Sequence, residues 1–499
     1  MNMPMIVSLL AYFVLMMGIG VYGYFKSTSN MSEYMLGGRQ LHPAVVALSA
    51  GASDMSGWML MGLPGAIYLF GLGSVWIAVG LVIGAYLNYL LVAPRLRVYT
   101  EEADDAITIP DYFEKRFYDH SHALRFFSSL VIVIFFTLYT SAGIVAGGKL
   151  FEASFGLDYQ VGSVITASAV VAYTMFGGFL AVSLTDFVQG CIMFIALILV
   201  PFVTWHELGN LEAASQSFTA LNPDYLSWFS GVTVLGIVSS LSWGLGYFGQ
   251  PHIIVRFMAI RSLSDIKIAR RIGMSWMIIT VIGSVLTGLF GFLYVSQTST
   301  VLDDPETVFI LLSQVLFNPY ISGFLLAAIL AAIMSTISSQ LLVSSSSLTE
   351  DFYKNFLRTE ASQKELVAVG RFSVLGVSIV ATLMALDSNS SILNLVSNAW
   401  AGFGSAFGPV ILLSLFWAGM TRNGALVSML SGAITILLWI YGPFTLNGEP
   451  LSAVVYEIIP GFAVATIAAV LVSKYDNPPS SEIISRHARI SALVAECKN

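Results

Sequence analysis

Long apolar segments recur along the whole chain, and they constrain its fold more than any other feature. A helix that spans a bilayer needs about 20 mostly apolar residues, and 56% of this chain is hydrophobic while only 10% is charged. The pattern predicts an all-α polytopic membrane protein with about thirteen transmembrane helices, and it excludes a soluble or disordered chain. The segments are about 5–25, 42–70, 74–98, 124–152, 160–178, 183–207, 230–255, 272–296, 319–348, 366–387, 392–418, 422–443 and 454–474.

The basic residues predict how the chain is oriented. With the N-terminus outside, 21 of the 22 Lys and Arg residues fall on the inner side, and only Lys149 falls outside. The outer loops 206–228 and 297–318 are acidic. Because inner loops of membrane proteins are enriched in Lys and Arg, we expect an external N-terminus and a cytoplasmic C-terminus. The loops are short, so residues 1–475 are expected to form one transmembrane domain, followed by a short cytoplasmic tail, 476–499.

An aspartate lies in the middle of the second segment. Asp54 falls in the run SAGASDMSGW, residues 49–58, and a charge at that depth costs about 2.5–3.5 kcal/mol on insertion scales. Glycine and serine are poor residues for a helix interior, so the run predicts a helix break whose free backbone groups bind a ligand. The alternative is a structural aspartate held by nearby backbone amides.

A second interruption is predicted five segments later. The run SWGLGYFGQP, residues 242–251, contains three glycines and a proline, which unwind a membrane helix. An odd separation gives two halves of opposite topology, and broken helices at matching places in two halves indicate an inverted-repeat transporter. The alternative is two independent glycine-rich packing kinks.

The ninth segment is rich in hydroxyl groups. One helix face, with the spacing i, i+3, i+4 and i+7, holds Ala332, Ser335, Thr336 and Ser339. Small residues favour close helix packing. They also suit an oxygen-only site for a small hard cation, and sodium fits better than a transition metal because no His or Cys accompanies the face. Asp186, near the inner start of the sixth segment, either caps that helix or serves the exit of the ion.

Other chemistry is not indicated. Cys191 and Cys497 form neither a disulfide framework nor a metal motif. The run 143–150 resembles a phosphate-binding loop, but Leu150 replaces the required Ser or Thr. No basic stripe indicates nucleic acid. We therefore expect no enzymatic activity, no cofactor besides a coupling ion, and no obligatory protein partner.

Several blocks of the sequence resemble the sodium/solute symporter family, and within it the bacterial branch that transports proline. The blocks are 49–58, WGLGYFGQPH at 243–252, AAIMST at 331–336, LGGR at 36–39, IPDYF at 109–113 and MTRNGA at 420–425. The resemblance runs from about residue 5 to 475. It implies a leucine-transporter-like fold with two five-helix inverted repeats, here about 42–207 and 230–418, plus extra helices.

The resemblance also implies two sets of site residues. It assigns sodium binding to carbonyls and hydroxyls of Ala52, Met55, Ala332, Ser335 and Thr336, with Asp54 and Asp186 in supporting roles. It places the solute near Ser56, Gly57, Tyr139, Trp243, Tyr247 and Pro251. The last three are spaced i, i+4, i+8, which in an α-helix would make one face for a pyrrolidine ring.

The function that the resemblance implies is sodium-coupled import of L-proline across the bacterial inner membrane by alternating access, with the N-terminus in the periplasm. Pantothenate, a monocarboxylate or a sugar is the main alternative solute, and a proton is an alternative coupling ion. A transporter-like membrane sensor is the rival from another class, and a channel is less favoured because broken helices around a central site favour alternating access.

Overall fold

The computed structural model describes residues 3–26, 36–209, 217–218, 220–298, 300–446 and 448–496. Part of the predicted outer loop 206–228, and Cys497, lie outside these residues. The described elements are helices apart from one hairpin, in which β1 (Thr445–Leu446) pairs with β2 (Glu449–Pro450). The chain is therefore nearly all-helical, as predicted.

The α-helices of the first half are α1 (Met3–Lys26), α3 (Pro43–Asp54), α4 (Leu63–Phe70), α5 (Val75–Leu87), α6 (Ala93–Glu102), α7 (Ile109–Phe117), α8 (Ala123–Phe155) and α9 (Tyr159–Leu208). Those of the second half are α11 (Val234–Leu241), α12 (Pro251–Ala259), α13 (Asp265–Thr298), α14 (Val308–Val315), α15 (Pro319–Ser346), α16 (Gln363–Met384), α17 (Ile392–Phe416), α18 (Arg422–Tyr441), α19 (Leu451–Val454), α20 (Ile458–Tyr475) and α21 (Ser481–Glu496). Short 3₁₀ or π-helical pieces are η1 (Gly37–Arg39), η2 (Trp58–Gly62), η3 (Gly71–Ser74), η4 (Asn88–Val92), η5 (Ser242–Gly249), η6 (Pro305–Thr307) and η7 (Ser347–Leu357).

Ten helical stretches in the described part of the chain are long and apolar enough to cross a membrane. The predicted number of thirteen is larger because three predicted segments are not separate continuous helices. Segment 42–70 runs on into 74–98 within one apolar stretch, 160–178 is joined to 183–207 in α9, and 230–255 is divided into α11, η5 and α12. Thirteen crossings remain a prediction.

The chain reverses direction within α9, at Gly178. Its φ of 61° and ψ of −167° interrupt the helix, and glycine takes such a positive φ without steric cost. Contacts with α1 on either side establish the reversal. Tyr173 lies before the break and Ala181 eight residues later, yet they lie against Gly20 and Gly23, which are only three residues apart in α1. Beyond the break the chain runs back along α1, since Gln189 donates a hydrogen bond to the hydroxyl of Tyr12. The two predicted segments in α9 are therefore antiparallel neighbours.

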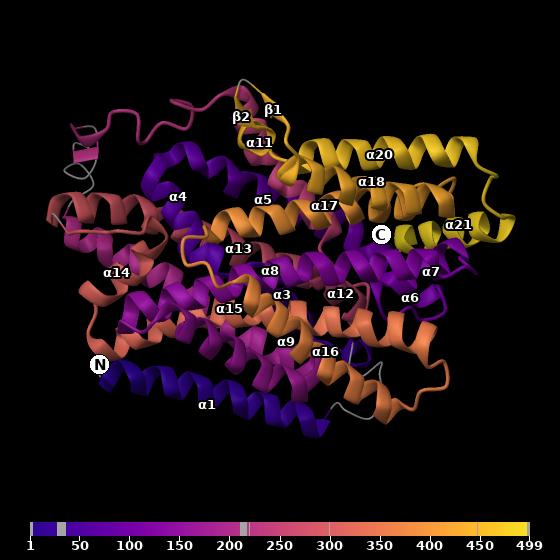
Figure 1. The fold of residues 1–499 in the computed structure, drawn as a ribbon, viewed down its shortest axis with the longest axis horizontal. Helices are drawn as coiled ribbons and strands as arrows, with labels where there is room; N and C mark the ends of the chain where they lie inside the picture. The colour runs from indigo at the N-terminus through magenta and orange to yellow at the C-terminus, as the bar shows by residue number, and fades with distance from the viewer. Residues whose placement is uncertain are drawn as a thin grey trace.

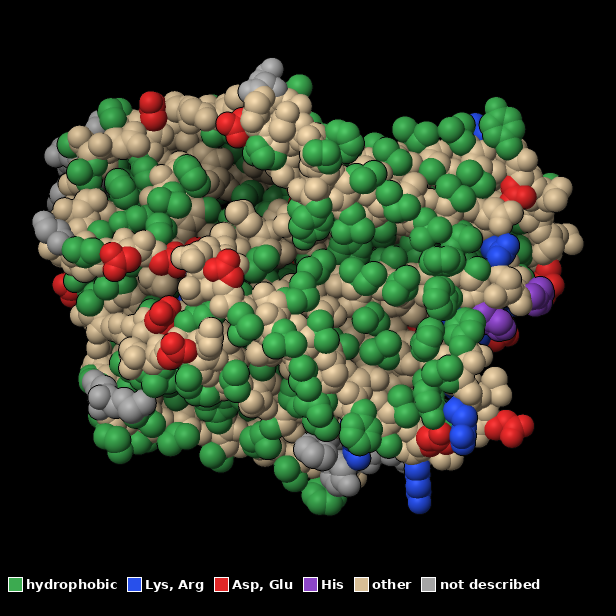
Figure 2. All heavy atoms as spheres, viewed as in Figure 1, with side chains coloured by type: hydrophobic (Ala, Val, Ile, Leu, Met, Phe, Trp, Pro, Cys, Tyr) green, Lys and Arg blue, Asp and Glu red, His purple; other side chains and the backbone are tan. Residues whose placement is uncertain are grey.

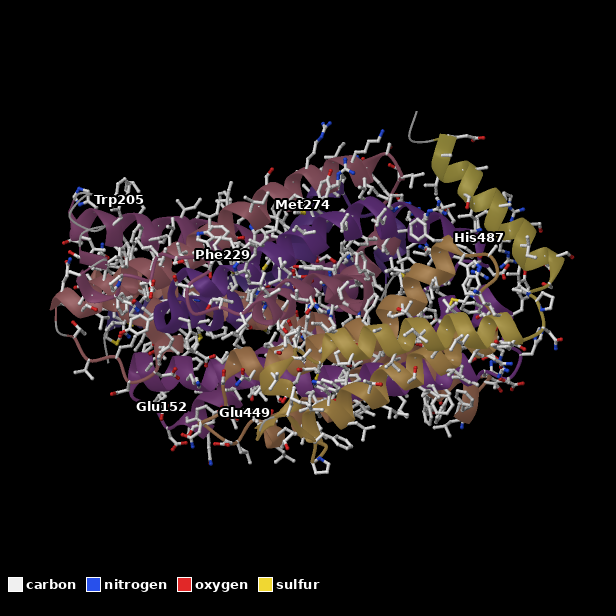
Figure 3. The ribbon with its side chains drawn as sticks, turned by 90° about the horizontal axis from the view of Figure 1, so that it is seen from above. Glu152, Trp205, Phe229, Met274, Glu449 and His487 are labelled. Atoms are coloured by element: carbon white, nitrogen blue, oxygen red, sulfur yellow. The ribbon has the colours of Figure 1, made fainter. Side chains whose placement is uncertain are left out.

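The helices lie roughly along one axis, with α1 on one flank and α18 and α20 on the other (Figure 1). Charged side chains gather at the two ends, and hydrophobic side chains cover most of the face between them (Figure 2). Acidic residues prevail at one end, whereas most visible Lys and Arg residues lie at the other, mixed there with acidic residues and histidines. In Figure 3, Glu152 and Glu449 lie toward the end opposite His487 of α21. This distribution fits a bundle that crosses a bilayer.

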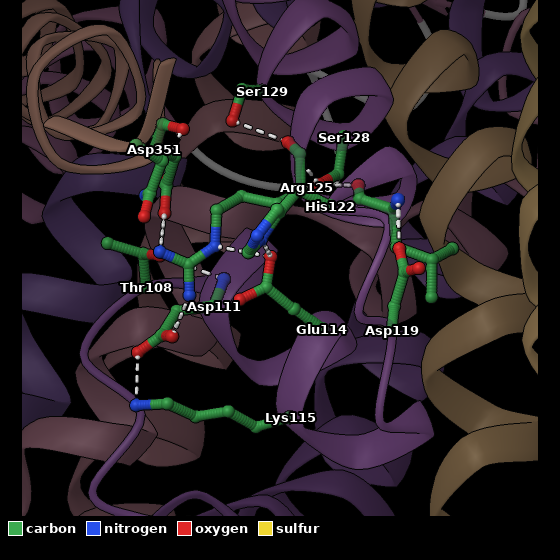
Figure 4. A network of polar contacts seen from close by, with 12 residues as sticks. Thr108, Asp111, Glu114, Lys115, Asp119, His122, Arg125, Ser128, Ser129 and Asp351 are labelled. Carbon is green, nitrogen blue, oxygen red and sulfur yellow. Dashed lines mark hydrogen bonds and ion pairs between the residues drawn. The ribbon is translucent and has the colours of Figure 1, made fainter. Parts of the chain in front are cut away.

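At the basic end, Arg125 at the start of α8 holds three elements together (Figure 4). Its guanidinium pairs with Asp111 of α7, with Glu114 at 3.0 Å and with Asp351 of η7 at 3.8 Å. Thr108 donates a further hydrogen bond to Asp351 at 2.8 Å. All four acidic and basic side chains are largely shielded from solvent, so the network fixes the short helix α7 against the bundle.

Asp119 connects the loop after α7 to α18. Its carboxylate accepts hydrogen bonds from Ser121, from the backbone N–H of Leu124 and from Arg422 at 2.6 Å. Burial acts to raise the pKa of Asp119, but these hydrogen bonds outweigh it and hold the pKa below its ordinary value of 3.8.

The tail 476–499 is not merely an extension, because α21 packs on α6. Its apolar residues Ile483, Ile490 and Val494 are buried. Arg489 pairs with Glu102 at 2.9 Å, and Ser491 accepts a hydrogen bond from Arg95 at 3.1 Å.

Lys149, the exception to the predicted charge distribution, is paired at the acidic end. Its ammonium group lies 2.9 Å from both Asp304 and Glu306. Glu306 also accepts backbone N–H groups of Ile392 and Leu393 at the start of α17. Carboxylates of the loop 297–318 thus neutralise the charge of Lys149.

Candidate functional site

The predicted break in the second segment is present. Helix α3 ends at Asp54, and Met55 caps it with non-helical angles of φ −80° and ψ 73°. Helical structure resumes at Trp58 as the π-helical piece η2, and the Trp58 indole donates to the Asp54 carbonyl at 3.1 Å. Asp54 is 2% exposed. A carboxylate therefore lies at the break, inside the bundle.

The second predicted break is also present. Helix α11 gives way to the 3₁₀ piece η5, and Gln250 leaves the helix before α12 begins at Pro251. Two of its glycines allow close packing: a Cβ on Gly244 would collide with the carbonyl of Gly80, and one on Gly246 with the Trp400 indole. The packing interpretation and the break interpretation therefore both hold for this run.

The 3₁₀ geometry changes which way the aromatic side chains point. With about 3.0 residues per turn, residues four apart are rotated by roughly 120° instead of sharing a face. Trp243 stacks on Tyr456, with ring centroids 5.2 Å apart, whereas Tyr247 turns toward Asp54. The single aromatic face expected from α-helical spacing is not formed.

Asp54 and Tyr247 join the two breaks directly. The Tyr247 hydroxyl donates a hydrogen bond to Oδ2 of Asp54. Both residues are buried, and Oδ1 of Asp54 has no hydrogen-bond partner among the described residues. Hydrogen bonds to a buried carboxylate are strong in surroundings of low dielectric constant, so the two halves are coupled at this point.

Four of the five residues assigned to sodium are brought together where α3 meets α15. The Ser335 hydroxyl donates to the carbonyls of Ala52 at 2.7 Å and Ala332 at 3.1 Å. The Thr336 hydroxyl donates to the same Ala332 carbonyl at 3.2 Å. All the atoms that these residues offer to an ion are oxygens, which suits a small hard cation. Met55 follows at the end of α3, next to Asp54.

Asp186 belongs to a second buried cluster rather than to a helix cap. It lies about two turns after the reversal at Gly178, and its Oδ2 accepts from Ser49 at 2.7 Å and from Arg256 at 2.9 Å. Arg256 also donates to Ser339, the last residue of the predicted hydroxyl face, at 2.5 Å. The cluster links α3, α9, α12 and α15, so Asp186 connects elements of both predicted repeats.

The residues that the resemblance assigns to the solute do not form one group. Tyr139 is buried and lies close to Ser56 and Asp54. Gly57 is tightly packed, since a Cβ there would come within 2.9 Å of Ala146. Trp243 and Tyr247 diverge as described.

Pro251, the remaining residue of this set, lines a different cavity from the one that Tyr247 lines. It begins α12 and lines a separate cavity of about 20 Å³ with Pro110 and Phe179.

Sequence reasoning missed three residues of this region. Trp400 packs edge-on against Tyr247 at 5.0 Å and donates its indole N–H to the Trp243 carbonyl at 2.8 Å. Tyr456 stacks on Trp243 from outside the two expected repeats, and Arg256 pairs with Asp186. The only signal was their residue type, because aromatic and arginine side chains within apolar segments usually have a polar partner.

Comparison with known proteins agrees with this geometry. Residues 34–432 match the sodium:solute symporter family. The chain belongs to this family. Among curated relatives, the osmoregulated proline transporter OpuE of Bacillus subtilis is 58% identical over 96% of each chain. The high-affinity proline transporter PutP of the same species is 57% identical over 94% of this chain and 97% of its own length. A sodium/proline symporter of Staphylococcus aureus is 53% identical over 99% of this chain and 97% of its own.

Solved structures show that this member of the family has the leucine-transporter-like fold. A substrate-bound, outward-open sodium-coupled sialic acid symporter superposes with a TM-score of 0.81 over 96% of this chain and 99% of its own, at 19% identity. A nucleobase-cation-symport-1 family transporter in a closed conformation gives 0.56 over 93% and 99%, at 14% identity. Two five-helix inverted repeats, as predicted, account for the two breaks.

Proposed function

We propose that this protein is a sodium-coupled symporter that imports L-proline across the bacterial inner membrane, and that it is not an enzyme. The observation that carries the proposal is the meeting of two interrupted helices at Asp54 and Tyr247, beside the oxygen set on α3 and α15. Such paired breaks bind solute and ion in transporters of this architecture. The names of relatives more than 50% identical supply the solute.

In this proposal the ion and the solute bind on connected elements. Sodium binds to the carbonyls of Ala52, Met55 and Ala332 and to the hydroxyls of Ser335 and Thr336, while the charge of Asp54 favours the cation nearby. Proline binds near Ser56, Gly57 and Tyr139, where backbone N–H groups freed by the break suit its carboxylate. Tyr247 and Trp243, which point in different directions from η5, border the solute at two separate places. Pro251 shapes the segment that follows.

Coupling follows from linkage. Sodium orders the junction of α3 and α15, which is one hydrogen bond away from Tyr247, so the ion raises the affinity for proline and proline raises that for sodium by the same factor. A membrane potential of 100 mV supplies about 2.3 kcal/mol per charge, and a tenfold sodium ratio adds about 1.4 kcal/mol. Together they sustain a proline gradient of roughly several hundredfold.

The proposal includes an orientation and a division of the chain. The N-terminus is periplasmic and the C-terminus cytoplasmic, as the basic loops favour. The repeats comprise about 42–207 and 230–418. A reporter that is active only in the cytoplasm should be active when fused after residue 499 and silent within 208–226. Activity at the second position would contradict the orientation.

The decisive test is counterflow in proteoliposomes. Vesicles preloaded with unlabelled proline should accumulate labelled proline when sodium is present, and should do so poorly when choline replaces it. Pantothenate, lactate and glucose should not compete. Counterflow of one of these solutes instead of proline, or equal counterflow without sodium, would overturn the proposal.

A further inference from the structure

A small cavity lies beside Asp54, on the side of α3 away from Ser335 and Thr336, and Met55 of the predicted sodium set also borders it. It has a volume of about 20 Å³, and α3 lines it with Ala47, Ala50, Gly51 and Asp54. This spacing of i, i+3, i+4 and i+7 marks one helix face. Ala52, whose carbonyl contacts Ser335, points to the opposite face. The other walls come from α5, η4, α12 and α13, and Figure 3 shows the lining residue Met274 about midway along the molecule.

Three polar side chains line this cavity without a hydrogen-bond partner among the described residues. They are Asp54 through Oδ1, Asn88 through both amide atoms, and Tyr89 through its hydroxyl. Their exposed fractions are 2%, 1% and 7%. Most buried side-chain polar atoms are hydrogen-bonded in folded proteins. Three unpartnered side chains that line one cavity large enough for a water therefore point to a shared ligand.

The two residues beside Asp54 are unusual in their own segment. Asn88 is the only amide or charged residue between positions 75 and 94. It opens the π-helical turn η4, and such turns are frequent at functional sites. Gly273 of α13 makes room for the Tyr89 hydroxyl, since a Cβ there would lie 2.9 Å from it. The local backbone thus accommodates these polar groups instead of covering them.

We propose that this cavity is a binding site for one water molecule, held between Asp54, Asn88 and Tyr89. A water needs about 10–15 Å³ and two to four polar partners, and the cavity provides both. The water donates to Oδ1 of Asp54 and to the amide oxygen of Asn88, and it accepts from Tyr89. A sodium ion fits less well, because one carboxylate and a few neutral oxygens do not fill its coordination shell and the Asn88 amide also presents N–H donors.

The site makes Asn88 and Tyr89 positioning residues for Asp54. Tyr247 holds Oδ2 of the carboxylate, and the water holds Oδ1, so the carboxylate is fixed from both sides while sodium binds between α3 and α15. This role rests on the proposed sodium coupling. The presence of the water does not, because it depends only on the cavity and its lining.

Radiolytic labelling by a brief X-ray pulse tests for the water. Hydroxyl radicals formed from a bound water oxidise the side chains that touch it, so Met274, which is 8% exposed, should be labelled. Met59 is fully buried and does not line the cavity, so it should stay unlabelled. Asn88→Leu replaces the amide by an apolar group of similar size and should lower Met274 labelling at least severalfold. Equal labelling in Asn88→Leu and the unaltered protein, or none in either, would overturn the proposal.

Sodium titration of the purified protein, followed by tryptophan fluorescence, tests the positioning role. Tyr89→Phe and Asn88→Leu should raise the sodium dissociation constant by about five- to tenfold, as expected when a hydrogen bond to a charged group is lost. Asn88→Ser retains a polar partner for water and should largely restore affinity. Tyr86→Phe on the same helix is the matched control, since its side chain is exposed.

Two results distinguish this role from a purely structural one. In an Asp54→Asn background, Tyr89→Phe should have no further effect on sodium affinity, because it acts through the carboxylate. Additive effects, or unchanged sodium affinity in both cavity variants, would refute positioning. If saturating sodium abolished Met274 labelling, the cavity would hold the ion and the water site would be wrong. If the protein failed to transport proline at all, the labelling result would still stand.

Discussion

The phenol of Tyr247 donates a hydrogen bond to the carboxylate of Asp54, and this contact joins the interrupted helix of one half to that of the other. Tyr247→Phe removes only this hydrogen bond, which is worth about 1.5–3 kcal/mol to a charged acceptor. We expect half-saturating sodium to rise about tenfold or more in transport assays. Asp54→Asn should impair transport more severely. The double variant should resemble Asp54→Asn alone; a further additive loss would show that the two side chains act independently.

Ser335 and Thr336 provide the hydroxyls of the proposed sodium site. Replacing either by Ala removes one oxygen ligand, so half-saturating sodium should rise about tenfold, and high sodium should partly restore uptake. Ser346→Ala is the matched control, because that hydroxyl lies outside the proposed site and donates to the Leu342 carbonyl one turn earlier in α15. Wild-type sodium dependence in both site variants would mean that the site lies elsewhere.

Trp243 is proposed to form a wall of the proline pocket, and Tyr456 supports it by stacking. Trp243→Ala should remove about 1.5–3 kcal/mol of burial, so half-saturating proline should rise at least about tenfold at saturating sodium. Sodium dependence should change less, and a ring-expanded analogue should gain relative to proline. Tyr456→Ala should reproduce part of the effect, whereas Tyr456→Phe keeps the stacked ring.

Trp76 provides the control for that experiment. It packs against Trp228 instead of the breaks, so Trp76→Ala should leave the proline dependence unchanged. A fall in expression and turnover with constant half-saturating proline in Trp243→Ala would assign the indole to packing.

Asp186 and Arg256 form a fully buried ion pair. Removing one partner of such a pair typically costs about 3–5 kcal/mol, because the other charge is left unpaired. Arg256→Gln should therefore lower the thermal unfolding midpoint in detergent more than the double change Asp186→Asn with Arg256→Gln. A double variant less stable than the single one would contradict this.

The hydrogen-bonded carboxylate of Asp119 predicts that the stability of the fold depends on pH. Its lowered pKa contributes stability that is complete above the ordinary aspartate value of 3.8 and is lost as the pH falls through the folded-state pKa. The melting difference between the wild type and Asp119→Asn should be constant from neutral pH to about pH 5 and shrink below about pH 4. A melting difference that grows as the pH falls would reverse the sign and refute the assignment.

Composition and local residue type were sufficient to predict the helices and both breaks. Glycine, serine and proline affect the backbone within a few residues of their own positions, so the helix breaks in 49–58 and 242–251 could be predicted. The face of Ser335 and Thr336 was predicted because α15 is a regular helix. These signals are short-range.

Long-range partners and irregular geometry were not predictable. The pairing of Asp186 with Arg256 spans 70 positions, and the stacking of Tyr456 on Trp243 depends on how α20 docks. The 3₁₀ form of η5 points Trp243 and Tyr247 in different directions. Its close packing at Gly244 involves the backbone of Gly80, which is distant in sequence. Asn88 carried a usable signal, as a lone amide in an apolar helix, but its closeness to Asp54 depends on tertiary packing.

The same ion pair has a consequence for synthesis. At roughly 5–20 residues per second, the ribosome makes Asp186 about 4–14 s before Arg256, which follows 70 residues later. During that interval the nascent helix around Asp186 carries an unneutralised carboxylate, with Ser49 already made and Ser339 still to come. The unpaired carboxylate disfavours transfer of this helix into lipid, so we expect it to stay at the insertion machinery until Arg256 has been made. The order of translation then affects how the bundle is assembled.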